Sequence, residues 1–296
     1  MGCSPPYFTS VMTEETADLM TNRLEAEPLD KQNRALIISI GNELLIGKVL
    51  NTNAQRISEE LTKLGFVVDA ALTVRDDVLS IAEAFRYALF KPVQVVISTG
   101  GLGPTFDDVT LDGLARALNR PLVLNEQALK IIKEKYAARG MPLTPERVKM
   151  AYLPLGALPL ANPAGTAPGV YVRVRGTHIF VLPGPPKEVE AVFESGVKPI
   201  LQRIFKAEEF LEASFTVQGI PESEFAPVVK RAVRSYPRVY VKSHPKGVEL
   251  GAPILEIHLT SFGVSSKWDL AECFSFLVSE AKRLGGSVKV SIAPPA

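Results

Sequence analysis

The sequence predicts an α/β protein with a three-layer, mostly parallel sheet, followed by a second, smaller α+β domain. Between residues 35 and 120, short β-branched apolar runs alternate with helical patterns, and such alternation builds parallel sheets covered on both faces. Beyond residue 206 the order becomes β-α-β-β-α-β, which is the split βαβ or ferredoxin-like pattern. The chain has 296 residues, 46% of them hydrophobic, which is enough for two cores.

We expect the first domain at residues 34–205. Apolar periodicity, helix stop signals and turn residues place its elements. The strands are expected at 35–41, 66–74 and 93–99, with a hairpin at 169–184 that turns at Arg175-Gly176. The helices are expected at 54–64, 78–89, 109–120, 126–140, 144–153 and 185–205.

The small domain is expected at residues 206–296, and residues 1–33 form an acidic tail. The tail has little apolar periodicity, so we expect it to be disordered or loosely packed. In the small domain, strands are expected at 214–220, 238–245, 254–263 and 287–292, with helices at 222–235 and 269–286.

Composition narrows the classes of partner. The net charge is +1 at pH 7, and no basic block is interleaved with aromatic residues, so we expect neither a nucleic-acid nor a membrane surface. The two cysteines, Cys3 and Cys273, are far apart in sequence and form neither a disulfide framework nor a zinc knuckle. With no signal peptide or membrane helix in the sequence, we expect a cytoplasmic protein.

The segment ISTGGLGPTFDDVT, residues 97–110, places a glycine-rich turn between a strand and a helix. The carboxyl ends of parallel strands are where α/β sheets bind ligands, and free N–H groups at a helix start favour anions. Residues 101–106 of this segment lack the third glycine of a dinucleotide fingerprint. The run 41–49 resembles a Walker loop, but its spacing is one residue too long and Val49 replaces the metal-binding hydroxyl. We therefore expect a phosphate at Gly100, Gly101, Gly103 and Thr105.

Two carboxylates follow this turn, where phosphate charge would lie. Helix capping explains one of them, because Thr105-x-x-Asp108 is close to a capping box. We expect Asp107 to cap the helix and Asp108 to bind a divalent cation that offsets the phosphate charge. Oxygen ligands favour Mg²⁺, Mn²⁺ or Co²⁺. His178 and His258 are expected to be structural, and His244 is left open.

Three further segments combine turn formers with polar side chains. In GNELLIGKVLNTN, the carboxylate of Glu43 is flanked by apolar residues and needs a partner or an ion, whereas Asn51 and Asn53 either cap a helix or line the site. In PGPPKE, Glu188 either favours the helix dipole or faces a ligand. In NPAGTAPG, residues 162–169, the backbone can approach a ligand closely.

Together the segments GNELLIGKVLNTN, STGGLGPTFDDVT, NPAGTAPG and LPGPPKEVEAV resemble the CinA (competence and damage inducible) family, whose first domain is molybdopterin-binding-like. The likeness covers residues 34 to 290, and it implies that the small domain is KH-like. It also implies a metal-dependent pyrophosphatase for ADP-ribose-like dinucleotides, helped by K⁺, in a homodimer. Many family members carry a C-terminal deamidase domain, and residues 1–296 leave no room for it.

Carried over residue by residue, the resemblance implies that Gly100, Gly101 and Gly103 cradle phosphate. Asp108 matches the metal-associated aspartate, and Glu43 matches the acid of the first motif. Three more residues match positions that line the same cleft, namely Asn53, Gly184 and Glu188. Glu43 and Asp108 are thus the candidate catalytic and metal-binding residues.

Two functions remain open at this point. The first is hydrolysis of a phosphoanhydride in a dinucleotide such as ADP-ribose or FAD. The second is non-catalytic or adenylylating binding of molybdopterin or a related phosphorylated ligand. A third role, subunit assembly, fits the small domain, because its sequence carries no GxxG clamp for RNA.

Overall fold

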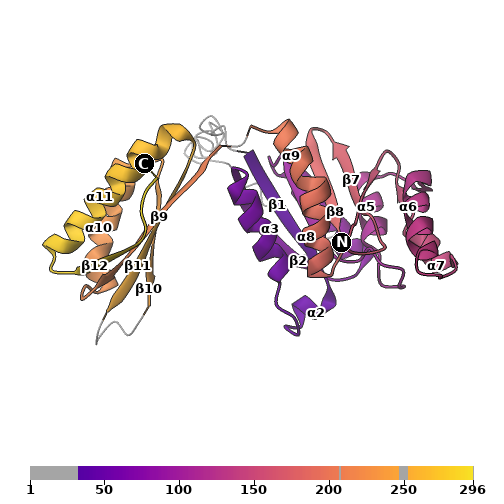
Figure 1. Cartoon of the computed structure of the whole chain (residues 1–296), viewed down its shortest axis with the longest axis horizontal. Helices are drawn as coiled ribbons and strands as arrows, with labels where there is room; N and C mark the ends of the chain where they lie inside the picture. The colour runs from indigo at the N-terminus through magenta and orange to yellow at the C-terminus, as the bar shows by residue number, and fades with distance from the viewer. Residues whose placement is uncertain (1–32, 207, 247–252, 296) are drawn as a thin grey trace, which may run out of the picture. The chain divides into compact units, whose positions relative to one another are not determined.

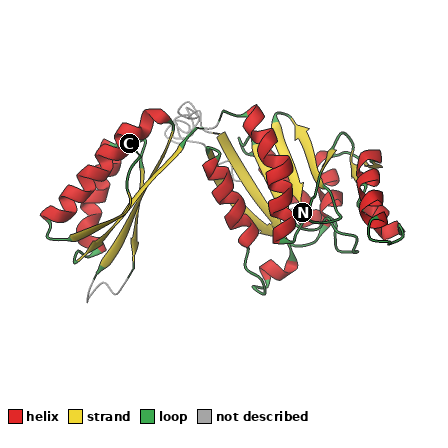
Figure 2. Cartoon of the chain, in the orientation of Figure 1, coloured by secondary structure: helices red, strands yellow, loops and turns green. Residues whose placement is uncertain are grey.

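The computed structural model describes residues 33–206, 208–246 and 253–295 (Figures 1 and 2). The predicted acidic tail lies outside the described residues, except for Asn33, which begins the first strand. None of the described helices is long and apolar enough to cross a membrane.

The larger sheet is mixed, with the strand order β2-β1-β3-β8-β7-β6. Strands β2, β1, β3 and β8 pair in parallel with one another in that order, whereas β7 pairs antiparallel with both β8 and β6. The bounds are β1 Asn33–Ile40, β2 Phe66–Val74, β3 Val95–Thr99, β6 Leu158–Leu160, β7 Gly169–Val174 and β8 Thr177–Leu182. The expected hairpin is confirmed, with Arg175 and Gly176 both at positive φ, as a type I′ turn requires.

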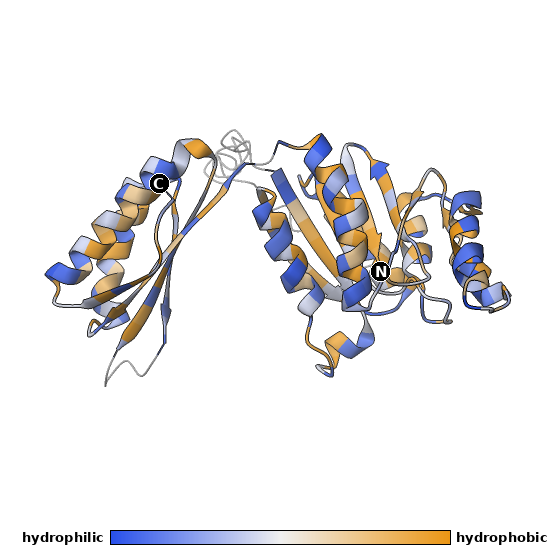
Figure 3. Ribbon diagram, in the orientation of Figure 1, coloured by the Kyte–Doolittle hydropathy of each residue, from blue (hydrophilic) through white to orange (hydrophobic). Residues whose placement is uncertain are grey.

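Helices cover both faces of this sheet, as the alternation predicts. Their bounds are α2 Asn42–Leu45, α3 Thr52–Lys63, α4 Val78–Phe90, α5 Thr110–Leu118, α6 Glu126–Ala137, α7 Pro145–Lys149, α8 Pro186–Val192 and α9 Lys198–Ile204. Alternate residues of β1 separate the two cores: Leu36 and Ile38 pack with α4 and α5, and Ala35 and Ile37 pack with α3 and α8. Figure 3 shows the contrast between these apolar strands and the polar outer face of α3.

Two helix predictions need correction. The sequence predicts one helix over residues 144–153, but α7 ends at Lys149 and Tyr152–Pro154 form strand β5, which pairs with β4, Leu122–Leu124. The helix expected at 185–205 is interrupted by a π-helical segment, Phe193–Val197, between α8 and α9. A π turn inserts one residue and changes the direction of the following side chains.

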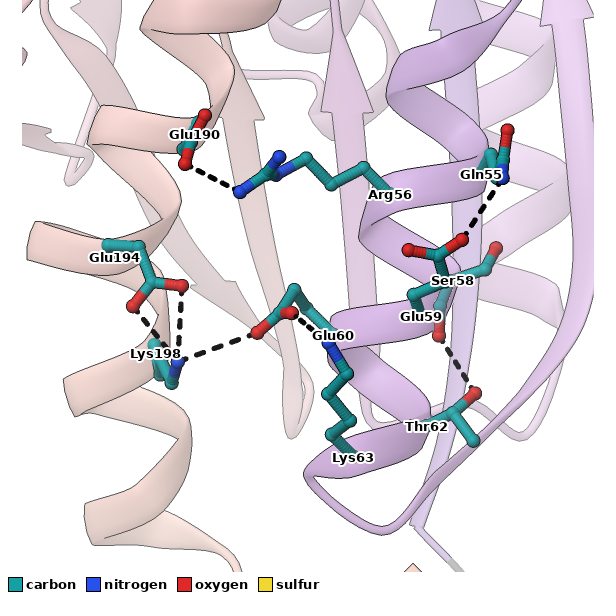
Figure 4. A network of polar contacts seen from close by, with 10 residues as sticks. All are labelled: Gln55, Arg56, Ser58, Glu59, Glu60, Thr62, Lys63, Glu190, Glu194 and Lys198. Atoms are coloured by element: carbon teal, nitrogen blue, oxygen red, sulfur yellow. Dashed lines mark hydrogen bonds and ion pairs between the residues drawn. The ribbon is translucent and has the colours of Figure 1, made fainter. Parts of the chain in front are cut away.

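Ion pairs join α3 to the α8–α9 segment (Figure 4). Arg56 on α3 contacts Glu190 on α8 at 2.5 Å, and Lys198 lies 3.4 Å from Glu60. Exposed pairs of this kind each contribute about 0–1 kcal/mol, so the buried residues Ile57 and Leu61 supply most of the stabilisation. The start of α3 is thereby held beside the turn that precedes α8.

The smaller sheet is antiparallel, with the order β10-β11-β9-β12. Its elements are β9 Phe210–Gln218, α10 Glu222–Ser235, β10 Tyr240–Pro245, β11 Ile254–Phe262, α11 Lys267–Arg283 and β12 Ser287–Ile292. Strand β11 lies between β9 and β10, which is the arrangement that a split βαβ pattern predicts. Helices α10 and α11 supply Phe225 and Leu277 to its core.

Candidate functional site

The carboxyl ends of the parallel strands bring the predicted motifs to one edge of the larger sheet. Strand β1 ends at Ile40 and is followed by Glu43, and β3 ends at Thr99 and leads into the glycine turn. Strand β8 ends at Leu182, just before Gly184. Because parallel strands share this edge, segments that are far apart in sequence meet there.

The glycine turn is held by the neighbouring strands. The Gly100 N–H donates to the carbonyl oxygen of Leu182 at 3.1 Å, and Thr110 Oγ1 donates to the Gly100 carbonyl at 2.9 Å. Gly100 has φ +104, and a Cβ there would lie 2.1 Å from the Ile40 oxygen. Only glycine fits such an approach at positive φ.

Three consecutive backbone N–H groups in this turn are free to bind a ligand. The amides of Gly101, Leu102 and Gly103 donate to no other described residue, although Leu102 is buried. Successive unpaired N–H groups form an anion-binding concavity, termed a nest. An anion placed against the turn would meet three N–H donors that have no acceptor among the described residues.

The two aspartates after the turn serve the loop itself. Asp108 Oδ2 accepts hydrogen bonds from the Thr105 amide at 2.8 Å and from the Thr105 hydroxyl at 2.6 Å. The expectation that Asp107 caps helix α5 is wrong, because the N-cap is Val109 and no side chain caps it. Asp107 Oδ1 instead lies 2.5 Å from the Thr105 hydroxyl, whose single proton is shared between the two carboxylates, and this hydrogen bond is the main cause that lowers the pKa of Asp107.

A lysine from α7 fixes the same loop. Lys149 Nζ donates to the carbonyl oxygens of Thr105 and Asp108, each at 2.8 Å. No local sequence pattern marks Lys149 as a site residue, because its partners lie 41 and 44 residues earlier in the chain. Its charge also lies beside the turn, where it favours an anion.

Asn53 and Gly184 meet as the resemblance implied. Asn53 Nδ2 donates to the Gly184 carbonyl at 2.8 Å, which ties the start of α3 to the turn after β8. Asn51 has the local role: its side-chain oxygen accepts from the Ala54 amide and caps α3. A Cβ on Gly184 would approach only the Cα of Gly100, at 3.7 Å.

Glu188 holds the NPAGTAPG segment. The buried Asn162 donates from Nδ2 to Glu188 Oε2 and to the Ala167 carbonyl, each at 2.7 Å. Lys135 on α6 donates to the backbone oxygens of Asn162 and Gly165. Desolvation is the main cause that lowers the pKa of Lys135. Two lysines from the α6–α7 region therefore each fix one motif loop.

The candidate metal ligands Glu43 and Asp108 lie in the loops that follow β1 and β3. Glu43 is exposed, the Asp108 carboxylate is satisfied by Thr105, and within the ranges that the structure describes no cluster of three His, Cys, Asp or Glu side chains is placed to hold a metal. A further acid at this edge, which the sequence did not single out, is Asp76, and it accepts from the Asn42 amide at 2.7 Å. Burial is the main cause that raises the pKa of Asp76, and the charges of Glu43 and Asp107 add to it.

A cavity of about 220 Å³ adjoins the glycine turn. Its polar lining is formed by Gly101, Gly103, Asp108, Asp112 and Lys149. The remaining wall is largely apolar, formed by Leu102, Leu111, Leu122, Met150 and Tyr152. This pairing of an anion nest with an apolar wall suits a ligand with a phosphate and a flat ring.

None of the three histidines belongs to the motif loops, and His178 lies near the start of β8, at the end of that strand away from this edge. His178 is buried at 3% exposure and its Nδ1 lies 2.9 Å from the Tyr171 hydroxyl, as a structural histidine would. Burial is the main cause that lowers its pKa. His258 lies 3.4 Å from Glu256 on the smaller sheet, and the His244 ring stacks edge-on against it.

Comparison with known proteins places this geometry in a family. The family described as "Probable molybdopterin binding domain" matches residues 36–203, which include the turns around the nest. The chain belongs to this molybdopterin-binding family. The match runs from Leu36 in β1 to Arg203 in α9 and includes part or all of every strand of the larger sheet.

Relatives extend the likeness of this molybdopterin-binding family member into the smaller domain. A protein of Pyrobaculum calidifontis is 52% identical over 225 residues, 76% of this chain and 86% of the relative. One from Aeropyrum pernix is 47% identical over 263 residues, 88% of this chain and 98% of the relative. The crystal structure of the protein CinA from Thermoplasma acidophilum is 45% identical, covering 57% of this chain and 99% of that one, with TM-score 0.54. The resemblance to CinA is therefore supported for the larger domain.

Proposed function

We propose that the larger domain binds a phosphorylated pterin of the molybdopterin type. The single observation that carries the proposal is the nest of unpaired N–H groups at Gly101, Leu102 and Gly103. A phosphate in the nest would accept these donors, and Lys149 would add a positive charge nearby. The family match supplies the pterin as the ring that the phosphate carries.

The adjoining cavity supports a planar ring beside the phosphate. Leu102, Met150 and Tyr152 line it, and apolar or aromatic walls are the usual partners of flat heterocycles. The acidic residues that follow the turn are explained without a metal, because Asp107 and Asp108 both hold Thr105. They shape the loop and leave the backbone donors free for the anion.

Calorimetric titration of the full chain with a neopterin phosphate and with unphosphorylated neopterin tests this function. We expect the phosphate to tighten binding at least tenfold and the Gly101→Ala variant to lose that gain, because its Cβ would lie 2.3 Å from Thr110 Oγ1. Gly140→Ala is the matched control, since Gly140 also has positive φ but no atom within 4 Å of its Cβ position. Equal affinity for both pterins in the wild type would contradict the proposal.

A second candidate is hydrolysis of a phosphoanhydride in ADP-ribose or an FAD-like dinucleotide, with Mg²⁺, Mn²⁺ or Co²⁺ and K⁺. One observation favours it, namely that Glu43 and Asp107 lie near Asp76. Burial is the main cause that raises the pKa of Asp76, and the charges of these two residues raise it further. Pterin binding has a family match behind it, and among the described residues no group of three His, Cys, Asp or Glu side chains is placed to hold a metal, so we rank this candidate second. Chromatography after incubation with ADP-ribose and each metal tests it, and Asp76→Asn should abolish any product formation.

For the smaller domain we propose a KH-like unit that contacts a second copy of the chain. Its β-α-β-β-α-β order supports the resemblance, and its sequence lacks a GxxG clamp for RNA. Light scattering of the full chain after size-exclusion chromatography should give the mass of a homodimer. A monomer at all concentrations would contradict this role.

A further inference from the structure

A second cavity lies at the far end of α5 from the glycine turn. It measures about 500 Å³ and is lined by Arg86, Ala115, Arg116, Asn119, Arg120 and Pro121. Helix α5 has 9 residues, so at 1.5 Å per residue its two ends are about 13 Å apart. The cavity is therefore separate from the nest at Gly101–Gly103.

The charge of this cavity is entirely positive. Its wall contains three guanidinium groups and no carboxylate. None of these three arginines forms an ion pair with another described residue. The nearby acids on the same helices face elsewhere, with Glu83 in the cavity beside β2 and Asp112 in the cavity beside the glycine turn.

The arginines retain unused donors. Arg86 donates from Nη2 to the Arg116 carbonyl at 3.2 Å, and Arg120 donates from Nη1 to the Leu155 carbonyl at 3.1 Å. The Arg116 guanidinium makes no hydrogen bond to another described residue. A guanidinium has five N–H donors in a planar fork, so most donors in this cavity have no acceptor among the described residues.

Support of the helix end explains only part of this arrangement. A cation near a helix C-terminus contributes about 0.3–1 kcal/mol, and Arg116 lies in the last turn of α5. Arg86 and Arg120 line the same cavity but lie outside the last turn of α5, so the helix dipole does not account for them. An anion that accepts from all three would use the free donors.

The backbone that carries these side chains is well fixed. Helix α5 ends at Asn119 in the left-handed conformation, and the Arg120 amide donates to the Ala115 carbonyl at 3.0 Å. Gly113 packs α5 tightly on α4, because a Cβ there would lie 2.4 Å from Ile81 Cγ2. The arginines are thus presented by two packed helices and a capped turn.

We propose that this cavity binds a phosphorylated small molecule through its diphosphate group, independently of the pterin site. Guanidinium forks match phosphate oxygens in bidentate geometry. The absence of carboxylates from the wall also removes the usual ligands of a bridging Mg²⁺. The site therefore suits an anion bound directly by arginine.

Calorimetric titration of the full chain with inorganic pyrophosphate tests the site, with ADP as a second probe. We expect Arg116→Gln to remove one pyrophosphate-binding event or weaken it at least tenfold. Arg116→Lys should restore part of the affinity, because it keeps the charge and loses the fork. The matched control is Arg234→Gln, since Arg234 is also exposed in the last turn of a helix, α10.

The unfolding midpoint of the ligand-free protein distinguishes anion binding by Arg116 from a purely structural role. If Arg116 serves an anion, Arg116→Gln leaves the unfolding midpoint unchanged or raises it, while the rise that pyrophosphate causes in the wild type disappears. A lower midpoint without ligand, together with an unchanged pyrophosphate isotherm, overturns the proposal. Equal weakening in Arg234→Gln overturns it too, because the effect would then be one of net charge. Gly101→Ala should still bind pyrophosphate in the arginine cavity, so a failure of the pterin site and a failure of this cavity can be told apart.

Discussion

Lys149 Nζ donates a hydrogen bond to the backbone carbonyl oxygen of Asp108 across 2.8 Å. The same ammonium also binds the Thr105 carbonyl, so one side chain from α7 closes the loop that follows the glycine turn. The carbonyls face Lys149, while the amides of Gly101, Leu102 and Gly103 stay free of other described residues. The charge of the lysine and the free donors thus border one cavity.

Lys149→Met should weaken binding of a neopterin phosphate by about ten- to hundredfold, because each charged hydrogen bond contributes roughly 1.5–3 kcal/mol. Titration calorimetry measures this loss. The free energy of unfolding should fall as well, because the two hydrogen bonds from Lys149 to the loop are lost. Lys133→Met is the control, because Lys133 is an exposed lysine on α6. Equal affinity in wild type and Lys149→Met would show that the clamp has no part in binding.

Gly100→Ala should destabilise the protein by more than about 2 kcal/mol, because a steric clash adds to backbone strain. Positive φ alone costs an alanine about 1–2 kcal/mol, whereas the new Cβ would also lie 2.1 Å from the Ile40 oxygen. Gly140→Ala meets no atom within 4 Å and isolates the strain. Urea unfolding of both variants measures the difference, and equal losses would mean that β1 moves aside freely.

The order of strands and helices in the larger domain was accessible from sequence, because local periodicity controls it. Strand β2 occupies the expected residues 66–74, and the hairpin turns at Arg175-Gly176. The interruption of the last helix was not accessible. A Cβ on Gly196, in its π segment, would lie 3.3 Å from the Leu160 side chain, and that close approach depends on how β6 packs.

The candidate site was predicted to the level of its loops and not of its atoms. The glycine turn and the Asn53–Gly184 pair lie at the expected edge. The sequence did not settle the role of Asp108. A hydrogen bond to Thr105, three residues earlier, and a bond to a metal ion would both be compatible with the same Thr-x-x-Asp pattern. Lys135 and Lys149 could not be predicted, because their carbonyl partners are distant in the chain.

His178 should make stability depend on pH. Burial lowers its pKa below the ordinary value, so in the fold it stays neutral and can accept from the Tyr171 hydroxyl. The unfolded chain binds a proton at its ordinary pKa, about 6.5. The free energy of unfolding should therefore fall as the pH drops below that value, and level off below the folded pKa. Above a pH of about 6.5, the neutral His178 makes its full contribution to the free energy of unfolding.

The matched variant for this pH dependence is His178→Gln, which can still accept from Tyr171 and does not titrate. Denaturant unfolding at intervals from about pH 7.5 to about pH 5 measures both proteins. The wild type should lose more stability than the variant across the window below about 6.5. Parallel curves would mean that His178 carries its proton equally well in both states.

Cys273 should resist thiol reagents in the native protein. Its side chain is fully buried on α11, and desolvation, with a smaller effect of Asp269, raises its pKa to about 12. At pH 8 only about one thiol in ten thousand would then be ionised, and the thiolate is the nucleophile. In a Cys3→Ser variant, labelling with a disulfide reagent should therefore be slow in buffer and complete in denaturant. Equal rates in buffer and in denaturant would contradict this prediction. They would mean that the core around Cys273, which includes Leu270 and Phe274, opens readily in the native protein.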